Sequence, residues 1–313
     1  MRDPSNGART SMCPSDETNM EPANGTGVTS NSDDMPTNAS ATGDTDEVAI
    51  PRHRHPYLEP HLEGGFIAFA HRGGTSEWPE NTLPAFRHAV DLGYRYLETD
   101  VQLTADGQLA AFHDDDLQRT CARPGRISEM PWSHVAGVLV DGREPIPRLV
   151  DLLEEFPDSM INIDAKSDAT VEPLIELLRR TNDLDRVCIG SFSHRRLTRI
   201  RAALGEAVCT SASPREVVEW VAGRAPSGAS CLQVPAKQGP VTVTTARRVE
   251  RAAKAGLPVH VWTIDHPEDI QRLIDIGVHG IMTDQPAVLR DICRHNGIWP
   301  HDDDSPDGRP GTT

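Results

Sequence analysis

A regular alternation of strand-like and helix-like segments runs through most of the chain and constrains its fold more than any other feature. Each strand-like run is followed by a segment with the apolar spacing of a helix, as in residues 171–178. The strand-like runs lie at residues 66–70, 96–103, 160–165, 187–192, 207–212, 231–235, 258–264 and 280–283. Strands that alternate with helices form parallel sheets, so this α/β pattern predicts a closed (β/α)8 barrel of the TIM type.

One further apolar run, Leu109–Phe112, follows the second strand with no helix between them. The Asp-Gly pair just before it is a strong signal for a tight hairpin turn, so we interpret the run as a hairpin arm and not as a barrel strand. A two-residue turn would place Asp100 opposite His113. Because directly opposed residues share a face, this register predicts that Glu98, Asp100 and His113 converge.

The segments on either side of the barrel differ from it in composition. Residues 1–50 contain no Leu, Phe, Trp or Tyr, and residues 295–313 are rich in Asp, Pro and Gly. Such segments bury too little apolar area to offset their ordering entropy, so we expect two disordered tails, the second of them acidic. Residues 51–65 are interpreted as an exposed arm that leads into the barrel, and residues 66–294 as the barrel domain.

Charge and hydropathy exclude several classes of protein. The formal net charge is -16, whereas nucleic-acid binders present a basic face, so no nucleic-acid partner is expected. No run of about 18 apolar residues is present, so no membrane span is expected. The cysteines form no C-x-x-C pair, and we expect a cytoplasmic protein without a disulfide framework. Cys188, Cys209 and Cys231 fall in strand-like runs and are expected to pack as small buried hydrophobes.

Polar side chains gather where the predicted strands end. Active sites of such barrels form at the carboxyl ends of the strands, and the hairpin arm adds a histidine to this edge. The residues found there include His71, Arg72, Glu98, Asp100, His113, Asp164, Lys166 and Thr283-Asp284, together with Ser191, Phe192 and Trp262. Carboxylates suit Mg²⁺ or Ca²⁺, and two histidines suit an acid and a base. Arginine and lysine suit an anionic oxygen such as that of phosphate.

An ordered series of short motifs resembles the glycerophosphodiester phosphodiesterase family. The series is Ala70-His71-Arg72-Gly73, Pro79-Glu80-Asn81-Thr82, Glu98-Thr99-Asp100, Asp106-Gly107, His113-Asp114, Asn162-Ile163-Asp164-Ala165-Lys166, Ser191-Phe192, Val261-Trp262-Thr263 and Gly280-Ile281-Met282-Thr283-Asp284. It spans roughly residues 66 to 292. A single motif of this series is a weak indication, whereas the ordered set is highly specific.

This resemblance implies an enzyme that hydrolyses glycerophosphodiesters to an alcohol and sn-glycerol 3-phosphate. It implies an acid–base pair, His71 and His113; three ligands of one divalent cation, Glu98, Asp100 and Asp164; and two phosphate-binding residues, Arg72 and Lys166. Phe192 and Trp262 would form an apolar wall for the glycerol carbons or would belong to the core. Asp164 departs from the pattern, because the family usually has Glu there. The connection from residue 114 to residue 147 is short, so no large capping domain is expected.

Other functions fit the same barrel. A lysophospholipase D-like enzyme would need an apolar rim or a membrane anchor, and the sequence displays neither. A catalytically silent binding barrel would be expected to have lost one of the central residues, His71, Glu98, Asp100, His113 or Asp164, and all of them are present. The sequence therefore favours a small glycerophosphodiester as partner. It leaves open which histidine acts first, and whether a substrate hydroxyl or water attacks phosphorus.

Overall fold

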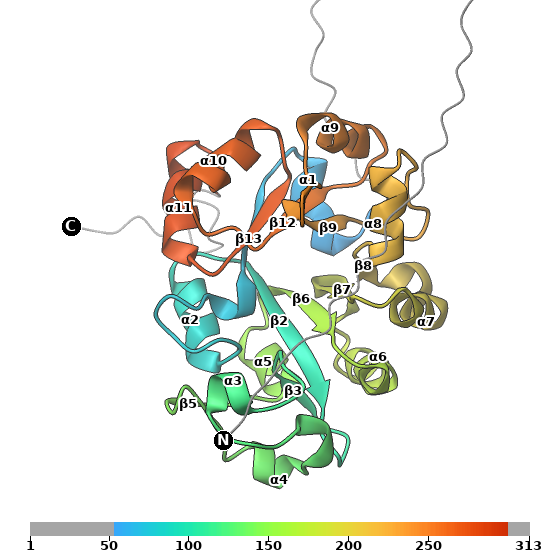
Figure 1. Cartoon of the computed structure of the whole chain (residues 1–313). Coiled ribbons are helices and arrows are strands. Elements are labelled where there is room, and N and C mark those ends of the chain that lie inside the picture. Colours follow the sequence, from blue (N-terminus) through green and yellow to red (C-terminus); the bar gives the residue numbers. More distant parts are fainter. Residues whose placement is uncertain (1–52, 300–313) are drawn as a thin grey trace, which may run out of the picture. The chain divides into compact units, whose positions relative to one another are not determined.

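The structure is a computed structural model that describes residues 53–299, and every structural statement below concerns these residues. Parallel strands form the barrel and helices surround them (Figure 1). In chain order the barrel strands are β1 (Ile67–Ala70), β2 (Tyr96–Leu103), β6 (Met160–Ala165), β7 (Val187–Gly190), β8 (Cys209–Thr210), β9 (Leu232–Pro235), β12 (Val259–Trp262) and β13 (Gly280–Thr283). The predicted TIM-type fold is confirmed.

The sheet is closed between its two end strands. Its strand order is β8-β7-β6-β2-β1-β13-β12-β9, so β8 and β9 form the ends of this path. A parallel bridge joins Ser211 to Cys231, and the backbone N–H of Ala212 donates to the Cys231 carbonyl at 2.9 Å. Most neighbouring strands of the sheet are paired over several residues. The contact between β8 and β9, which we call the seam, consists of only a short stretch of backbone.

One long helix follows each barrel strand, with the hairpin arm placed between β2 and its helix. These helices are α2 (Leu83–Asp91), α5 (Leu149–Glu155), α6 (Val171–Thr181), α7 (His194–Leu204), α8 (Pro214–Val221), α9 (Ala246–Lys254), α10 (Pro267–Asp275) and α11 (Pro286–His295). The start of α8 shows how the sequence sets a boundary. The Ser213 hydroxyl accepts from the Glu216 backbone N–H, and the Glu216 carboxylate accepts from the Ser213 N–H, which is a capping box.

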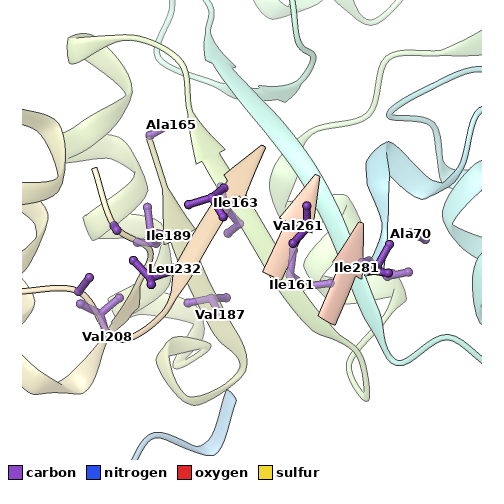
Figure 2. Packing of buried hydrophobic residues seen from close by; sticks show 14 of the residues in the cluster. Ala70, Ile161, Ile163, Ala165, Val187, Ile189, Val208, Leu232, Val261 and Ile281 are labelled. Atoms are coloured by element: carbon purple, nitrogen blue, oxygen red, sulfur yellow. The ribbon is translucent and has the colours of Figure 1, made fainter. Parts of the chain in front are cut away.

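Side chains alternate along each barrel strand between the helices and the barrel interior. In β6, Ile161, Ile163 and Ala165 belong to the large apolar cluster (Figure 2), which also contains helix residues such as Leu174 and Leu178, whereas Asn162 and Asp164 face inward and line a cavity. At the amino ends of the strands the interior is apolar instead. That floor consists of Tyr57, Leu58, Ile67, Phe69, Tyr96, Cys188, Cys209, Cys231 and Met282. The barrel is therefore polar at its mouth and apolar at its floor.

The segment before β1 is not the exposed arm that its basic composition suggests. It forms a short 3-10 helix, Pro56–Leu58, and α1 (Glu59–Leu62). Tyr57 and His61 are buried, and even His55 is only 7% exposed. The hydroxyl of Tyr96 donates to the Tyr57 carbonyl at 2.8 Å. The segment covers the apolar floor of the barrel. It is buried despite its polar sequence because the floor would otherwise be exposed to water.

The predicted C-terminal boundary is also corrected. Residues 295–299 belong to the barrel and not to a tail, because Trp299 is buried with its ring 5.1 Å from that of Tyr94. Asn296 donates to Gln271 at 2.8 Å. The predicted disordered tail at residues 1–50 and the rest of the tail predicted at residues 295–313, namely residues 300–313, lie outside the described residues. Within the described part of the chain, no helix has the length and apolar character needed to cross a membrane.

The hairpin arm is present, but its register differs from the prediction by one residue. Strand β3 (Leu109–Ala111) pairs antiparallel with β2, and Val101 lies opposite Ala111. The turn has three residues instead of two, because the Thr104 N–H donates to the Gln108 carbonyl around Gly107, whose φ is 83°. As a result Phe112, and not His113, lies opposite Asp100.

The arm continues through residues 114–147 and has a hydrophobic cluster of its own. Its elements are α3 (Gln118–Cys121), α4 (Trp132–Val135), β4 (Leu139–Val140) and β5 (Glu144–Pro145). Its buried residues are Ala110, Phe112, Leu117, Ile127, Val135, Val138, Val140 and Ile146. On the other side of the barrel, β10 (Lys237–Gln238) and β11 (Val241–Thr242) form a second small hairpin after β9.

Candidate active site

One cavity brings together the nine side chains for which the sequence predicts a role. Its volume is about 650 Å³, which is a common size for small-molecule sites. The nine residues His71, Arg72, Glu98, Asp100, His113, Asp164, Lys166, Phe192 and Trp262 all line it. They come from the carboxyl ends of β1, β2, β6, β7 and β12 and from the end of β3. The cavity therefore lies where barrels of this type carry their active sites.

Three buried carboxylates form the base of the cavity. Asp100 and Asp164 are register partners on the neighbouring strands β2 and β6, and Glu98 lies two residues before Asp100 on the same face. Glu98, Asp100 and Asp164 are 4%, 1% and 8% exposed. Burial, followed by repulsion from Asp100, raises the pKa of Glu98 to about 7. A group of three carboxylates this deeply buried needs compensating positive charge.

Two cationic side chains supply part of this charge. The Lys166 Nζ lies 2.6 Å from Asp100 Oδ1 and 2.8 Å from Asp164 Oδ2, and the Arg72 Nε lies 3.0 Å from Asp100 Oδ2. Burial acts to raise the pKa of Asp100, but Lys166 and Arg72 outweigh it and lower that pKa below its ordinary value. Asp100 is thus paired with two cations, and Asp164 with one.

Across residues 53–299, one oxygen atom of the three carboxylates is still free to accept a hydrogen bond or to bind a cation. Asp164 Oδ1 is buried and has no hydrogen-bond partner among the described residues. A buried carboxylate oxygen without a partner is costly, and a hard divalent cation would satisfy it. Glu98, Asp100 and Asp164 therefore fit such a cation in their chemistry as well as in their placement.

His71 is held in one orientation by an acidic partner. Its Nδ1 lies 2.8 Å from Asp284 Oδ1, and because a carboxylate accepts, Nδ1 carries the donated proton. The second ring nitrogen, Nε2, lies 3.8 Å from Glu98 Oε2. Burial lowers the pKa of His71, but Glu98 and Asp284 outweigh this effect and raise the pKa above its ordinary value. Asp284 follows β13, and its backbone N–H donates to Asp265 at 2.7 Å.

His113 has a matching partner on the arm. Its Nδ1 lies 2.5 Å from Asp114 Oδ1, which leaves Nε2 available. Asp114 in turn accepts from Arg119 Nε at 2.6 Å, and Arg119 also donates to Glu80. The one-residue difference in register does not remove His113 from the site. Strand β3 ends at Ala111, and the bend after Phe112 leaves His113 on the cavity wall.

Several positioning residues are absent from the nine for which the sequence predicts a role. Asn81 donates from Nδ2 to Asp100 Oδ2 at 3.0 Å and accepts from the Thr99 hydroxyl at 2.8 Å. Glu80 accepts from Arg72 Nη1 at 3.0 Å. Both belong to the Pro79-Glu80-Asn81-Thr82 motif, which was the available signal. Asp114 and Asp284 likewise stand in quoted motifs, but only the fold shows which histidine each one contacts.

One wall of the cavity is apolar. Phe192 is 66% exposed, and its ring lies 5.6 Å from that of Trp262 in an edge-to-face arrangement. The wall is completed by Pro214, Val217, Val218 and Val221 of α8 and by Val241 and Val243. An apolar rim is therefore present, although none is visible in the sequence. Its members come from separate segments and form no continuous run.

Comparisons with known proteins show which proteins this chain is similar to. A model of the glycerophosphoryl diester phosphodiesterase family matches residues 71–288. A Mycobacterium tuberculosis protein named "probable glycerophosphodiester phosphodiesterase 2" is 38% identical over 256 residues, which cover 78% of this chain and 97% of that protein. A human protein named lysophospholipase D is 25% identical over 291 residues, which cover 78% of this chain and 89% of that protein.

Solved structures show the same fold. A crystal structure from Silicibacter pomeroyi aligns with a TM-score of 0.67 and 24% identity, over 79% of this chain and 100% of that one. An Oleispira antarctica phosphodiesterase, solved in complex with the product sn-glycerol-3-phosphate, aligns with a TM-score of 0.62 and 23% identity, over 73% of this chain and 96% of that one. Both likenesses concern the fold.

Proposed function

Because the chain belongs to the glycerophosphoryl diester phosphodiesterase family and is an enzyme of that class, we propose that it hydrolyses glycerophosphodiesters to an alcohol and sn-glycerol 3-phosphate. One observation carries this proposal. Two histidines, each held at Nδ1 by a carboxylate, line the same cavity as three buried carboxylates and two cations. This combination supplies proton transfer, a place for a metal ion and phosphate binding at one point.

Glu98, Asp100 and Asp164 would hold one divalent cation, Mg²⁺ or Ca²⁺. When bound there, such a cation neutralises charge on a phosphoryl oxygen and lowers the pKa of a coordinated hydroxyl. Arg72 and Lys166 line the same cavity and carry positive charge, so they would bind the remaining phosphate oxygens. These roles suit a phosphodiester, whose own negative charge repels a nucleophile.

His71 and His113 would carry the protons. One histidine accepts the proton of the attacking hydroxyl at Nε2, the new P–O bond forms, and the bond to the leaving alcohol breaks. The other histidine donates its proton to that departing oxygen. If the glycerol hydroxyl attacks, a cyclic phosphate forms and water opens it with the two roles reversed. Attack by water would use the same pair in a single step. Each proton transfer contributes about 10²–10⁴ in rate.

A coupled assay for sn-glycerol 3-phosphate tests the proposal. With glycerophosphocholine, glycerophosphoethanolamine, glycerophosphoglycerol and glycerophosphoinositol as substrates, we expect release from at least one. Excess chelator should abolish the release, and added Mg²⁺ or Ca²⁺ should restore it. Failure to act on any of these diesters in the presence of cation would contradict the substrate class, and full activity in chelator would contradict the cation.

A second candidate function follows from the apolar wall. Phe192, Trp262 and the α8 valines form a surface that would accommodate an acyl chain, as a lysophospholipase D-like enzyme requires. The same assay, followed by choline release, compares lysophosphatidylcholine with glycerophosphocholine. A higher kcat/KM for the acylated substrate would make lysophospholipids the preferred class. The cytoplasmic location expected from the sequence stays a prediction.

The pH dependence should distinguish the two histidines. The pKa of His71 is raised because Glu98 and Asp284 outweigh the effect of burial. Asp284→Asn keeps an acceptor for Nδ1–H but removes a negative charge, so the imidazolium is less stabilised and the pKa falls. One limb of the pH profile of kcat/KM should therefore move to lower pH. A shift of the alkaline limb would identify His71 as the acid, and a shift of the acidic limb would identify it as the base.

The exposed residue Asp91 on α2 provides a matched control. Asp91→Asn makes the same chemical change outside the cavity and should leave both limbs in place. If Asp284→Asn also left both limbs unchanged, the proposed role of His71 in proton transfer would be wrong.

A further inference from the structure

Three thiols converge at the floor of the barrel, away from the carboxylate site. Cys188, Cys209 and Cys231 are fully buried, and their Sγ atoms all lie within 4.8 Å of one another. The Sγ atoms of Cys188 and Cys231 are 3.9 Å apart. Gly190 and Gln233, two residues further along β7 and β9, line the active-site cavity. The thiols therefore lie one layer of side chains below that cavity.

A buried histidine lies next to the three thiols, outside the group of ligand atoms that approach one another within 4.8 Å. His260 on β12 is fully buried and interacts with the Cys231 thiol. Its Nε2 lies 2.9 Å from the Nε2 of His61. Its other ring nitrogen, Nδ1, is buried and has no hydrogen-bond partner among the described residues. Since Nε2 is engaged by His61, Nδ1 is the ring nitrogen that remains available.

The hydrogen bonds around His61 determine which nitrogen of His260 carries a proton. The Nδ1 of His61 lies 3.0 Å from the Gly65 carbonyl, which only accepts, so this nitrogen is protonated. Because the His61 ring is buried against His260 and His279, we expect it to be neutral. A neutral His61 that is protonated at Nδ1 has a lone pair at Nε2. His260 must donate from its Nε2 to that lone pair. With Nε2 donating to His61, Nδ1 is the nitrogen of His260 that can serve as a metal ligand.

We propose that Cys188, Cys209, Cys231 and His260 form a tetrahedral site for a thiolate-preferring divalent cation, namely zinc. The ligands come from four successive barrel strands, β7, β8, β9 and β12. Three cysteines and one histidine are a common ligand set of structural zinc sites. A Zn–S bond of about 2.3 Å gives an Sγ–Sγ edge of about 3.8 Å in a tetrahedron. The observed Sγ–Sγ separations, 3.9 Å and at most 4.8 Å, need only a small contraction, whereas the His260 ring, which is outside that group, would have to move towards the thiols.

This donor set differs in kind from the active site. Thiolates and imidazole select zinc, whereas the carboxylates at the mouth select Mg²⁺ or Ca²⁺. The His260–His61–Gly65 hydrogen bonds fix the ring of one proposed ligand, as partners of metal-binding histidines commonly do. Packing of three thiols as small hydrophobes would explain their burial. It would not explain the buried Nδ1 of His260, which has no hydrogen-bond partner within residues 53–299.

Zinc at this position would bridge the closure of the barrel. Cys209 belongs to β8 and Cys231 immediately precedes β9, so the two thiols stand on opposite sides of the seam. Cysteine ligates a metal as the thiolate and not as the thiol, so binding would release the thiol protons and would be coupled to folding. We therefore expect loading to occur as the chain folds, because the ligands are buried in the finished barrel.

Cobalt is a suitable probe, because thiolate–cobalt charge-transfer absorption reports sulfur ligation directly. The full-length chain is unfolded under reducing conditions and refolded with Co²⁺, and in parallel with chelator. We expect one Co²⁺ per chain with thiolate charge-transfer bands and tetrahedral visible bands. Cys231→Ser should lose these bands. Cys293→Ser, which alters a buried thiol outside the cluster, should keep them. Cobalt at the carboxylate site has no thiolate ligand and gives no such band.

Thermal unfolding provides a second measurement. Zinc present during refolding should raise the Tm of the wild type and of Cys293→Ser, but not that of His260→Gln. A folded wild-type protein without thiolate–cobalt bands would overturn the proposal, and this result does not depend on whether any variant folds. Bands that persist unchanged in Cys231→Ser would overturn it as well. Phosphodiesterase activity can be present or absent in either case, so the two proposals fail independently.

Discussion

Replacing either His71 or His113 with asparagine should lower the turnover number by about 10²–10⁴, because each removes one proton transfer from the reaction. Asparagine keeps a polar group near the carboxylate partner but cannot exchange a proton at neutral pH. Release of sn-glycerol 3-phosphate under saturating substrate measures kcat, and the substrate dependence gives KM. We expect the loss to fall mainly on kcat, since the cations and carboxylates remain in place.

The double variant provides a further check on this pair. Residues that act together in one reaction are not additive, so it should lose less than the product of the two single losses. His134→Asn, at an exposed position of α4, should behave as the wild type. A single variant of His71 or His113 that kept near-wild-type turnover would remove that residue from the acid–base pair.

Asp164→Asn should weaken cation binding by about tenfold to hundredfold. It should also lower activity by orders of magnitude, and a high metal concentration should restore part of that activity. One oxygen of Asp164 is bonded to Lys166, and the other is buried without a hydrogen-bond partner in the part of the chain that the structure describes. The substitution removes a negative charge while it preserves the shape of the side chain. A metal titration of activity gives the midpoint that should shift.

Asp164→Glu and an exposed control complete this experiment. Glutamate restores the length usual in the family and should keep activity, with a changed preference between Mg²⁺ and Ca²⁺, because Mg²⁺ demands shorter and more regular contacts. Asp158→Asn, in the exposed turn before β6, should leave the midpoint unchanged. If Asp164→Asn lowered turnover at an unchanged midpoint, Asp164 would be an orienter of Lys166 and not a ligand.

The barrel is predictable from sequence because its strands are apolar on the side that faces the helices. Strands β2, β6 and β13 begin and end at the predicted residues. Strand β7 ends early, at Gly190, because Ser191 and Phe192 turn out of the sheet towards the cavity. The candidate site is predictable for a related reason, since parallel strands bring their carboxyl ends to one edge.

Features that depend on contacts between distant segments are not predictable in this way. Cys188 and Cys231 are far apart in the chain, and nothing in their spacing indicates that their Sγ atoms approach to 3.9 Å. The pairing of His71 with Asp284 likewise needs the closed barrel, which places β13 beside β1. The hairpin register was wrong because a three-residue turn and a two-residue turn both accommodate an Asp-Gly pair.

The two catalytic candidates rest on different hydrophobic clusters. His71 follows β1 and depends on the barrel, whereas His113 stands at the end of an arm with its own packed interior. Fold stability and catalytic competence are therefore divided between two parts of one chain. We expect substitutions inside the arm, at positions such as Leu117 or Ile146, to displace one half of the proposed acid–base pair while the barrel stays folded. The arm can thus accumulate changes that retune the enzyme without endangering its scaffold.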